Sequence, residues 1–495
     1  MTRVVLLGFV LAAAGASAVV ACRELTCEEN KTCESGATGS GDASTESGAG
    51  EGGVADGGGA DGAFPEGCEK SPAEAPETLS EKCGVFVSGT GQDVSPTGSR
   101  EVPAKSVGRG VQLAKTFARP WVFVCAGSYA ESVPVVADSA VSLFGKLDCG
   151  AAAADWKVGT KRAVLEGAAD APVLKVDGAK VRVEGMVLRA KDATQAGGSS
   201  VCVFANGGEL TVVGSVVQAG QGKDGDAGAS ASADAGARAT QGNVASGING
   251  GPLVACVCPD ATSTGGAGGT AAAGAMNGLP GGPPTDAGPP KNGAGGLASL
   301  ADCNAGSSGS EGAAGLDGGP GSVPSAYGVL SAGGWASSAG ADGSSGRLGQ
   351  GGGGGASLSG SGGGGGGCGG CGGAPGQGGA GGGGSIAIAA LNAKVTCTSA
   401  ELVTAAAGIG GKGGTGQPGQ AGGFAGNPGA GACLGGQGGN GGSGGPGGAG
   451  AGGVSVGVLY KGTAPSLDPA PTFDGGAPGD GGFAGVKQVT LEVTK

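Results

Sequence analysis

Four stretches of the chain share one pattern. Residues 136–145 read VADSAVSLFG, residues 176–185 VDGAKVRVEG, residues 205–214 ANGGELTVVG and residues 390–399 ALNAKVTCTS. Each opens with small or polar residues typical of a turn and continues as an alternating strand, and the first three end on glycine. Successive side chains of a strand point to opposite faces, so alternation predicts one buried face. The residues expected to point inward are Val141, Leu143, Val181, Val183, Leu210, Val212, Val395 and Cys397, and those expected outward are Lys180, Arg182, Glu184 and Thr211.

The repeat predicts an all-β solenoid. A single unit of this kind cannot bury its apolar face, whereas stacked units bury one continuous column. The hairpins of a β-sandwich are the alternative interpretation. They would need two-residue Asn-Gly or Asp-Gly turns at regular spacing, and such turns do not recur at that spacing here.

A second pattern lies upstream of the repeat and carries a resemblance. It reads V-x-V, G-x-D, P-x-x-S-V-x-x-x-V-x-x-A and V-x-V-x-x-G-x-Y-x-E, formed by Val85, Val87, Gly91, Asp93, Pro103, Ser106, Val107, Val111, Ala114, Val122, Val124, Gly127, Tyr129 and Glu131. This stretch resembles the first coil of right-handed parallel β-helix proteins of the pectin-lyase-like superfamily. Val107, Val111 and Ala114 fall on one face of a short helix. The resemblance implies that this helix covers the open end of the coil, where unpaired strand edges invite aggregation.

The first residues have the layout of an export signal. Arg3 precedes a short uncharged apolar run, which is too short to span a membrane. Val19-Val20-Ala21-Cys22 resembles the lipobox of bacterial lipoproteins, which implies a mature chain that begins at Cys22 and is anchored in the membrane by lipid on that cysteine. Arg23 is not the aspartate that tends to retain lipoproteins at the inner membrane, so the outer membrane is favoured. An ordinary cleaved signal with a chance cysteine is the alternative.

Changes of composition divide the rest of the chain. We expect a signal peptide over residues 1–21, a flexible tether over 22–67, capped β-helix coils over 68–219, and a further coil over 385–407. Glycine-rich insertions occupy residues 220–384 and 408–453, and closing strands are expected over 454–495. One strand-like island, Tyr327-Gly328-Val329-Leu330, interrupts the first insertion.

The insertions hold much of the glycine, which makes up 123 of the 495 residues. Residues 435–449 repeat the triplet GGX, and three residues per turn is the geometry of an extended polyproline-II helix. They resemble PE-PGRS-type surface proteins and glycine-rich antifreeze proteins, in which such helices pack in layers. Disorder is the alternative, because glycine loses the most conformational freedom on folding. Clustered cysteines favour order, since cross-links reduce the entropy of the unfolded chain.

The chain has 15 cysteines, and lipidation of Cys22 leaves an even number for disulfides in an oxidising compartment. The preferred pairs are Cys125 with Cys149 and then Cys68 with Cys83. For Cys27 and Cys33 we expect either a disulfide that closes a small local loop or pairing with a partner. For Cys368 and Cys371 a structural disulfide is favoured over redox chemistry and over a zinc site with Cys256 and Cys258. Alternation places Cys202 outward with Phe204 and Cys397 inward, so these two are not expected to pair.

Several kinds of chemistry are excluded or disfavoured. Histidine is absent, which rules out a Ser-His-Asp triad and imidazole acid–base catalysis. The net charge of -12 without a basic stripe disfavours nucleic acid. Asp224-Gly225-Asp226, Asp474 and Asp480 are interpreted as solvated turn acids, with calcium binding as the alternative. The outward residues Lys175, Lys180, Arg182, Glu184, Glu209 and Lys394 include no carboxylate pair, so no catalytic residue, metal or cofactor is expected.

These observations favour a non-catalytic cell-envelope lipoprotein that acts as a surface scaffold or adhesin. Its expected partners are the membrane, through the lipid anchor, and extracellular polysaccharide or other surface proteins. One alternative is a polysaccharide lyase or glycoside hydrolase on a β-helix face, for which Glu184 and Glu209 are the visible candidates. The other alternative is a calcium- or ice-binding surface.

Overall fold

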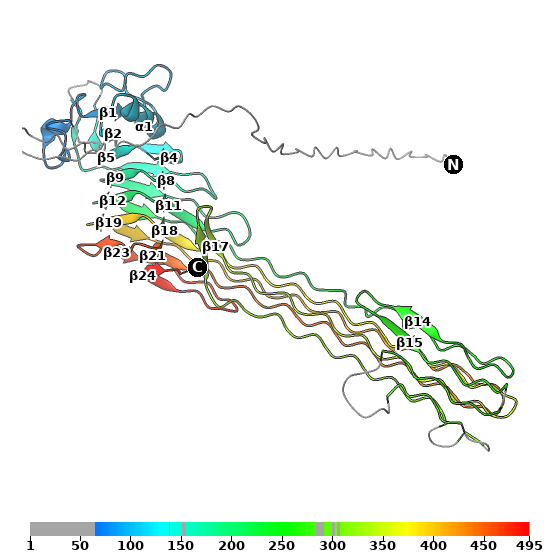
Figure 1. The fold of residues 1–495 in the computed structure, drawn as a ribbon. Coiled ribbons are helices and arrows are strands. Elements are labelled where there is room, and N and C mark those ends of the chain that lie inside the picture. Colours follow the sequence, from blue (N-terminus) through cyan, green and yellow to red (C-terminus); the bar gives the residue numbers. More distant parts are fainter. Residues whose placement is uncertain are drawn as a thin grey trace, which may run out of the picture. The chain divides into compact units, whose positions relative to one another are not determined.

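The computed structural model describes residues 65–137, 139–150, 155–272, 274–283, 292–298, 302–303 and 307–494. The predicted signal segment and the predicted tether up to residue 64, with Cys22, Cys27 and Cys33, lie outside these residues. The described chain is nearly all β-structure, and its large sheets are parallel (Figure 1).

Three sheets make up most of the regular structure. Sheet A contains β1 (Gly84–Val87), β2 (Trp121–Cys125), β5 (Ala140–Asp148), β9 (Lys180–Glu184), β12 (Glu209–Val213), β19 (Lys394–Thr398) and β22 (Ser466–Leu467), with β6 (Lys157–Val158) antiparallel to β5. Sheet B contains β3 (Ser128–Ala130), β7 (Ala163–Glu166), β10 (Met186–Arg189), β13 (Val216–Gln218), β20 (Glu401–Val403) and β23 (Thr472–Asp474). Sheet C contains β4 (Val133–Val136), β8 (Leu174–Asp177), β11 (Ser200–Asn206), β18 (Ser385–Leu391), β21 (Ser455–Lys461) and β24 (Lys487–Glu492).

The chain visits the three sheets in turn. From β7 onward it passes through sheets B, C and A and then begins again, so each circuit adds one strand to each sheet. Every new strand pairs in parallel with the strand that the previous circuit placed there. Figure 1 shows the resulting columns of strands, for example β5, β9, β12 and β19.

The predicted repeat lies in register within sheet A. Val141 is paired with Val181, Val181 with Leu210, and Leu210 with Val395. The residues at the second inward position, Leu143, Val183, Val212 and Cys397, are paired in the same way. The residues of both positions belong to one buried cluster. The prediction that the four stretches stack with these residues inward is therefore confirmed.

The final residue of the repeat turns the chain from sheet A towards sheet B. Gly185, Gly214 and Ser399 have φ angles of 65°, 52° and 49°, in the left-handed region that favours glycine. Gly145 ends the first copy but has another role, because it lies inside β5. A Cβ atom there would be 2.3 Å from the Cγ atom of Met186. Glycine is needed at that position for close packing.

The predicted helix is present as α1 (Val107–Thr116). Ser106 is its N-cap, and the Ser106 hydroxyl accepts a hydrogen bond from the Arg109 amide. Its buried face includes Val107, Leu113 and Ala114, and Val111 packs partly buried against the same core. One short 3-10 helix (Pro76–Thr78) precedes β1.

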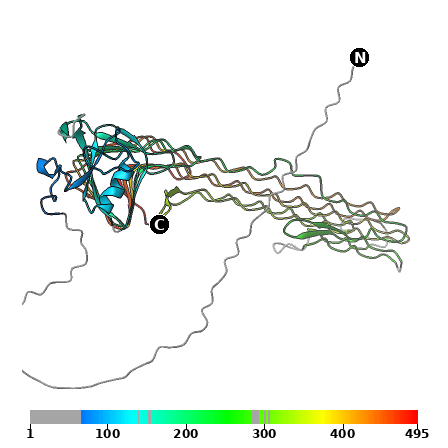
Figure 2. The same ribbon diagram turned by 90° about the horizontal axis from the view of Figure 1, so that it is seen from above.

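The glycine-rich insertions are ordered as extended chains that lie side by side (Figures 1 and 2). Their backbone groups bond to a given neighbour at every third residue, as a helix with three residues per turn requires. One ladder runs from the amides of Gly222, Gly225, Gly228 and Ala231 to the carbonyls of Ala406, Ile409, Lys412 and Thr415. We call the described, hydrogen-bonded segments within residues 220–384, 404–454 and 475–486 the glycine arm.

The arm continues the register of the sheets. The Gly364 amide in the arm donates to the Cys433 carbonyl, and the Asn392 amide at the end of sheet C donates to the Lys461 carbonyl. Donor and acceptor are the same number of residues apart in both bonds, so arm and sheet belong to one ladder without a shift. Residues 362–383 exchange hydrogen bonds with segments 223–243, 266–269, 340–355, 408–429 and 433–451. Side chains are excluded between such neighbours: a Cβ atom on Gly370 would lie 1.9 Å from the Gln420 carbonyl oxygen.

One orientation predicted from alternation is wrong. Cys202 points inward, because it belongs to the same buried core as Val203, whereas Phe204 packs in a second cluster outside sheet C. Two consecutive residues of β11 therefore face the core, which breaks simple alternation. The next strand does the same at Ala387 and Ile388. Cys397 points inward with Val395, as predicted.

Candidate functional site

The polar residues of the upstream pattern stabilise the start of α1. The Glu131 carboxylate accepts hydrogen bonds from the amides of Val107 (2.6 Å) and Gly108 (2.9 Å), at the positive end of α1. Asp93 accepts from the amides of Lys105 and Ser106 at 2.9 and 3.1 Å. Desolvation raises the pKa of Asp93, but hydrogen bonds from the Ser106 side chain and from these amides, with the nearby charge of Lys105, outweigh it, so that the pKa of Asp93 is lowered. Both acids are thus occupied by backbone donors.

The charged residues on the outer face of sheet A are largely paired with one another. Lys394 and Glu209 form an ion pair of 2.8 Å across β12 and β19. The Arg182 guanidinium lies 2.7 Å from Glu184, and the hydroxyl of Ser71 donates to the same carboxylate at 2.6 Å. Glu184 is buried, not exposed as alternation predicted, because the segment that holds Ser71 covers it.

The described cysteines form five disulfides. Cys68 is bonded to Cys83 and Cys125 to Cys149, the two pairs that the sequence favoured. The bond from Cys303 to Cys433 was not predicted, since nothing in the sequence indicates which glycine-rich segments are neighbours.

A local bond between Cys368 and Cys371 is not what the structure shows. Cys368 is bonded to Cys256 and Cys371 to Cys258. In an extended helix that rises 3.1 Å per residue, residues three apart are separated by about 9 Å, beyond the reach of a disulfide. The four cysteines that the sequence grouped as an alternative zinc site are therefore brought together as two disulfides.

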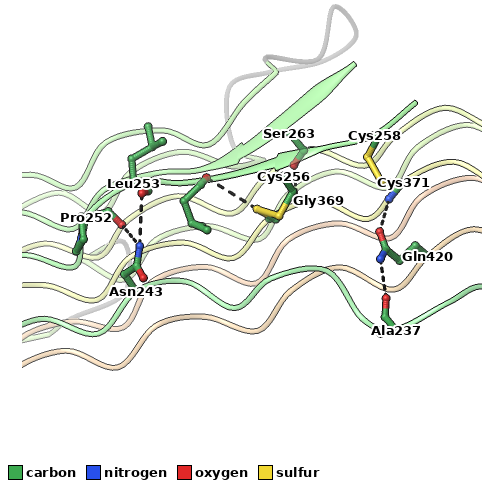
Figure 3. Close-up of a disulfide and its surroundings, with 12 residues drawn as sticks. Ala237, Asn243, Pro252, Leu253, Cys256, Cys258, Ser263, Gly369, Cys371 and Gln420 are labelled. Carbon is green, nitrogen blue, oxygen red and sulfur yellow. Dashed lines mark hydrogen bonds between the residues drawn. A yellow bond between two sulfur atoms is a disulfide. The ribbon is translucent and has the colours of Figure 1, made fainter. Parts of the chain in front are cut away.

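These two disulfides fix a hairpin to the arm (Figure 3). The hairpin consists of β14 (Val254–Val257) and β15 (Thr262–Gly265), which pair antiparallel. The Gly369 amide donates to the Ser263 hydroxyl at 2.6 Å, beside the bond between Cys256 and Cys368. The Gln420 side chain accepts from the Cys371 amide at 2.9 Å and donates to the Ala237 carbonyl at 2.6 Å. One glutamine thus links three segments of the arm.

Acceptor side chains bind amides along the arm's surface. Asp224 accepts from the Ile409 amide, Asp317 from the Ser443 amide and Asp342 from the Gly378 amide, each at 2.7 Å. Backbone groups at the edge of the bundle have no further helix to bond, so these carboxylates satisfy them. Asp224, one of the calcium candidates, has this structural role.

The other calcium candidates do not converge on a common site. Asp474 and Asp480 use their backbone carbonyls to accept from Thr404 and Gly410. Within the described ranges, no group of three or more Cys, Asp or Glu residues is arranged to hold a metal ion. No helix in this part of the chain is long and apolar enough to cross a membrane.

A cavity of about 410 Å³ lies between sheet C and a second hairpin. This hairpin, β16 (Gly328–Ser331) and β17 (Gly334–Ser337), arises from the strand-like island predicted at residues 327–330. Its Leu330 packs in one cluster with Phe204, Ile386 and Leu459 outside sheet C. The cavity is lined by Asp170, Lys175, Ser199, Val201, Phe204 and Trp335, with loop residues beside them. Trp335 was not expected to be part of a site.

Two cysteines in the described chain, Cys202 and Cys397, are free and buried in the core. Burial raises the pKa of each thiol to about 12, because the apolar interior disfavours the thiolate. Neither thiol is a nucleophile at neutral pH.

No known protein family, curated protein or solved structure matches this chain.

Proposed function

We propose that this protein is a non-catalytic, lipid-anchored scaffold of a bacterial cell envelope. The circuits of sheets A, B and C are interpreted as a right-handed parallel β-helix, and the glycine arm as a stiff projection from it. One observation carries the proposal: the arm is held by backbone hydrogen bonds and by disulfides between segments far apart in the sequence.

The construction of the arm supports a mechanical role. A glycine-rich chain is entropically costly to order, and it presents few side chains that a binding pocket or an active site needs. Here each inner segment is bonded to several neighbours and the bonds recur at every turn, so a load on one segment is shared by the others. This arrangement suits reach and stiffness better than catalysis.

The candidates for catalysis are engaged in structure. Glu209 is paired with Lys394, and Glu184 with Arg182 and Ser71, so neither carboxylate is poised as a general acid or base. General acid–base chemistry requires a carboxyl group within reach of the substrate proton. The scaffold is therefore favoured over a lyase or hydrolase.

The anchor in this proposal is lipid on Cys22, with residues 22–67 as a tether to the outer membrane. Extracellular polysaccharide and other surface proteins are the proposed contacts of the arm. A thioether lipid with several acyl chains would hold the protein firmly, because each buried methylene contributes about 0.8 kcal/mol.

Two measurements test the proposal. Cells that express the full chain are labelled with radioactive palmitate and fractionated; label in the outer-membrane fraction is expected, and Cys22→Ala should lose both label and membrane association. Adhesion of the same cells to polysaccharide-coated surfaces is then compared with that of cells expressing the Cys256→Ser, Cys258→Ser, Cys368→Ser, Cys371→Ser variant, for which weaker adhesion is expected. Turnover of an acidic polysaccharide by the purified protein would overturn a non-catalytic role.

A further inference from the structure

The cavity under the β16–β17 hairpin contains a positive charge without a partner. Lys175 is exposed on β8, and no described residue hydrogen-bonds or ion-pairs with its ammonium group. Asp170 also lines the cavity, but both of its carboxylate oxygens accept hydrogen bonds from Thr194. These neutral donors leave Asp170 with its negative charge but occupy both of its oxygens, whereas the ammonium group of Lys175 has donors left for a ligand.

An apolar wall lies beside this cation. Lys175 is paired in register with Phe204 of the next circuit, and Val201 is three residues before Phe204 on the outer side of the same strand. Trp335 contributes its ring from the hairpin, where it approaches the backbone of Gly328 closely: a Cβ atom on Gly328 would lie 2.6 Å from the indole Cζ2. Because Trp335 is only partly buried, a face or edge of the ring remains available.

We propose that this cavity binds a small carboxylic acid whose carboxylate is attached to a ring with an apolar face. The carboxylate contacts Lys175 and the ring lies against Trp335, Val201 and the edge of Phe204. The volume of about 410 Å³ falls within the usual range for small-molecule sites. This site is independent of the proposed scaffold function.

The charge and the wall together select this class. A cation would be repelled by Lys175 and would find both oxygens of Asp170 already accepting hydrogen bonds from Thr194. A neutral ring would leave the ammonium without an anion as the site is covered. An acyclic acid would leave the aromatic wall exposed to water. Aromatic acids and cyclic sugar acids both meet the requirement, and the experiment distinguishes between them.

Titration calorimetry on the purified full chain provides the test, with benzoate, cyclohexanecarboxylate, glucuronate and neutral benzamide as probes. We expect at least one of the acids to bind, with an affinity that falls as salt is added. If benzoate binds, neutral benzamide should bind about tenfold more weakly, because it lacks the charge that Lys175 attracts. Binding of benzoate alone would identify an aromatic acid, and binding of glucuronate alone a sugar acid.

Variants show where the probe binds. Lys175→Met should weaken binding of the acid about tenfold. The matched control is Lys412→Met, which removes the same charge from an exposed residue of the arm. Both lysines are exposed, so folding is not at risk. Trp335→Phe should weaken binding less than Trp335→Ala. The proposal is overturned if no acid binds, or if Lys175→Met binds an acid as tightly as the unaltered protein.

Discussion

Two adjacent glycines of the arm provide a matched test of its packing. A Cβ atom on Gly318 would lie 1.9 Å from the Ser344 carbonyl oxygen and 2.8 Å from the Gly445 nitrogen. The same atom on Gly319 would meet nothing closer than the Ser344 hydroxyl, at 3.7 Å. Neither glycine has a positive φ, so alanine is allowed by the backbone at both positions. Only the space between segments distinguishes them.

Gly318→Ala should loosen the arm locally. To reach an ordinary contact distance, the new methyl group must displace the segment that carries Ser344 by roughly 1 Å or more. Overpacking of this kind costs about 1–3 kcal/mol. The bond from the Gly318 amide to the Ser443 carbonyl, 2.7 Å long, would be strained as well, which adds about 1 kcal/mol. We expect a loss of about 2–4 kcal/mol in the free energy of local opening. Gly319→Ala should instead stabilise the arm by about 0.4–1 kcal/mol, because alanine restricts the unfolded chain.

Hydrogen exchange measured by mass spectrometry is the appropriate assay, since it reports local opening of peptides from residues 307–323 and 338–356. In Gly318→Ala these peptides should exchange faster by about 30-fold or more, at about 1.4 kcal/mol per factor of ten. Peptides from sheet A serve as an internal reference. Equal exchange in the two variants would refute the claim that the segments pack as closely as described.

Three further outcomes are expected. Ser399→Gly should raise the free energy of unfolding by about 0.5–1 kcal/mol, since Ser399 has φ 49° at a corner where other circuits have glycine; a fall in the denaturation midpoint would contradict this. Glu131→Ala should cost about 1–3 kcal/mol and speed exchange in α1, because two amides lose their acceptor. Cys202 and Cys397 should resist alkylation at pH 8 until denaturant is added. Their thiols have pKa 9.0 when unperturbed and about 12 when folded, so the unfolded chain loses protons first and stability should fall as pH rises from 9 to 12. Alkylation without denaturant, or stability that rises over that range, would contradict the burial.

Side-chain patterns made the coiled part predictable. The inward positions from Val141 to Cys397 were recognisable because apolar residues recur on one face of each strand, and the structure aligns them. The orientation of Cys202 was missed because two adjacent residues of β11 face the core, and alternation contains no signal for such a break.

The arm and the cavity were less accessible to sequence reasoning. A glycine triplet indicates the number of residues per turn, but it carries no side chain that specifies a neighbour. The partners of Cys368 and Cys371 therefore could not be deduced. The cavity depends on a hairpin packing against a sheet from which it is distant in sequence, so Trp335 and Lys175 shared no local motif.

The shared register of sheets and arm limits how such a protein can be resized. The described segments of the arm are matched bond for bond with their neighbours at every third residue. Removal of a triplet from one pass alone shifts all more distant residues of that pass by one turn, so their disulfides and side-chain contacts no longer meet their partners. Matched triplets taken from all passes at the same distance from the sheets would shorten the projection and leave its other pairings intact. Extension by coordinated duplication, one turn at a time, is the corresponding route to a longer one.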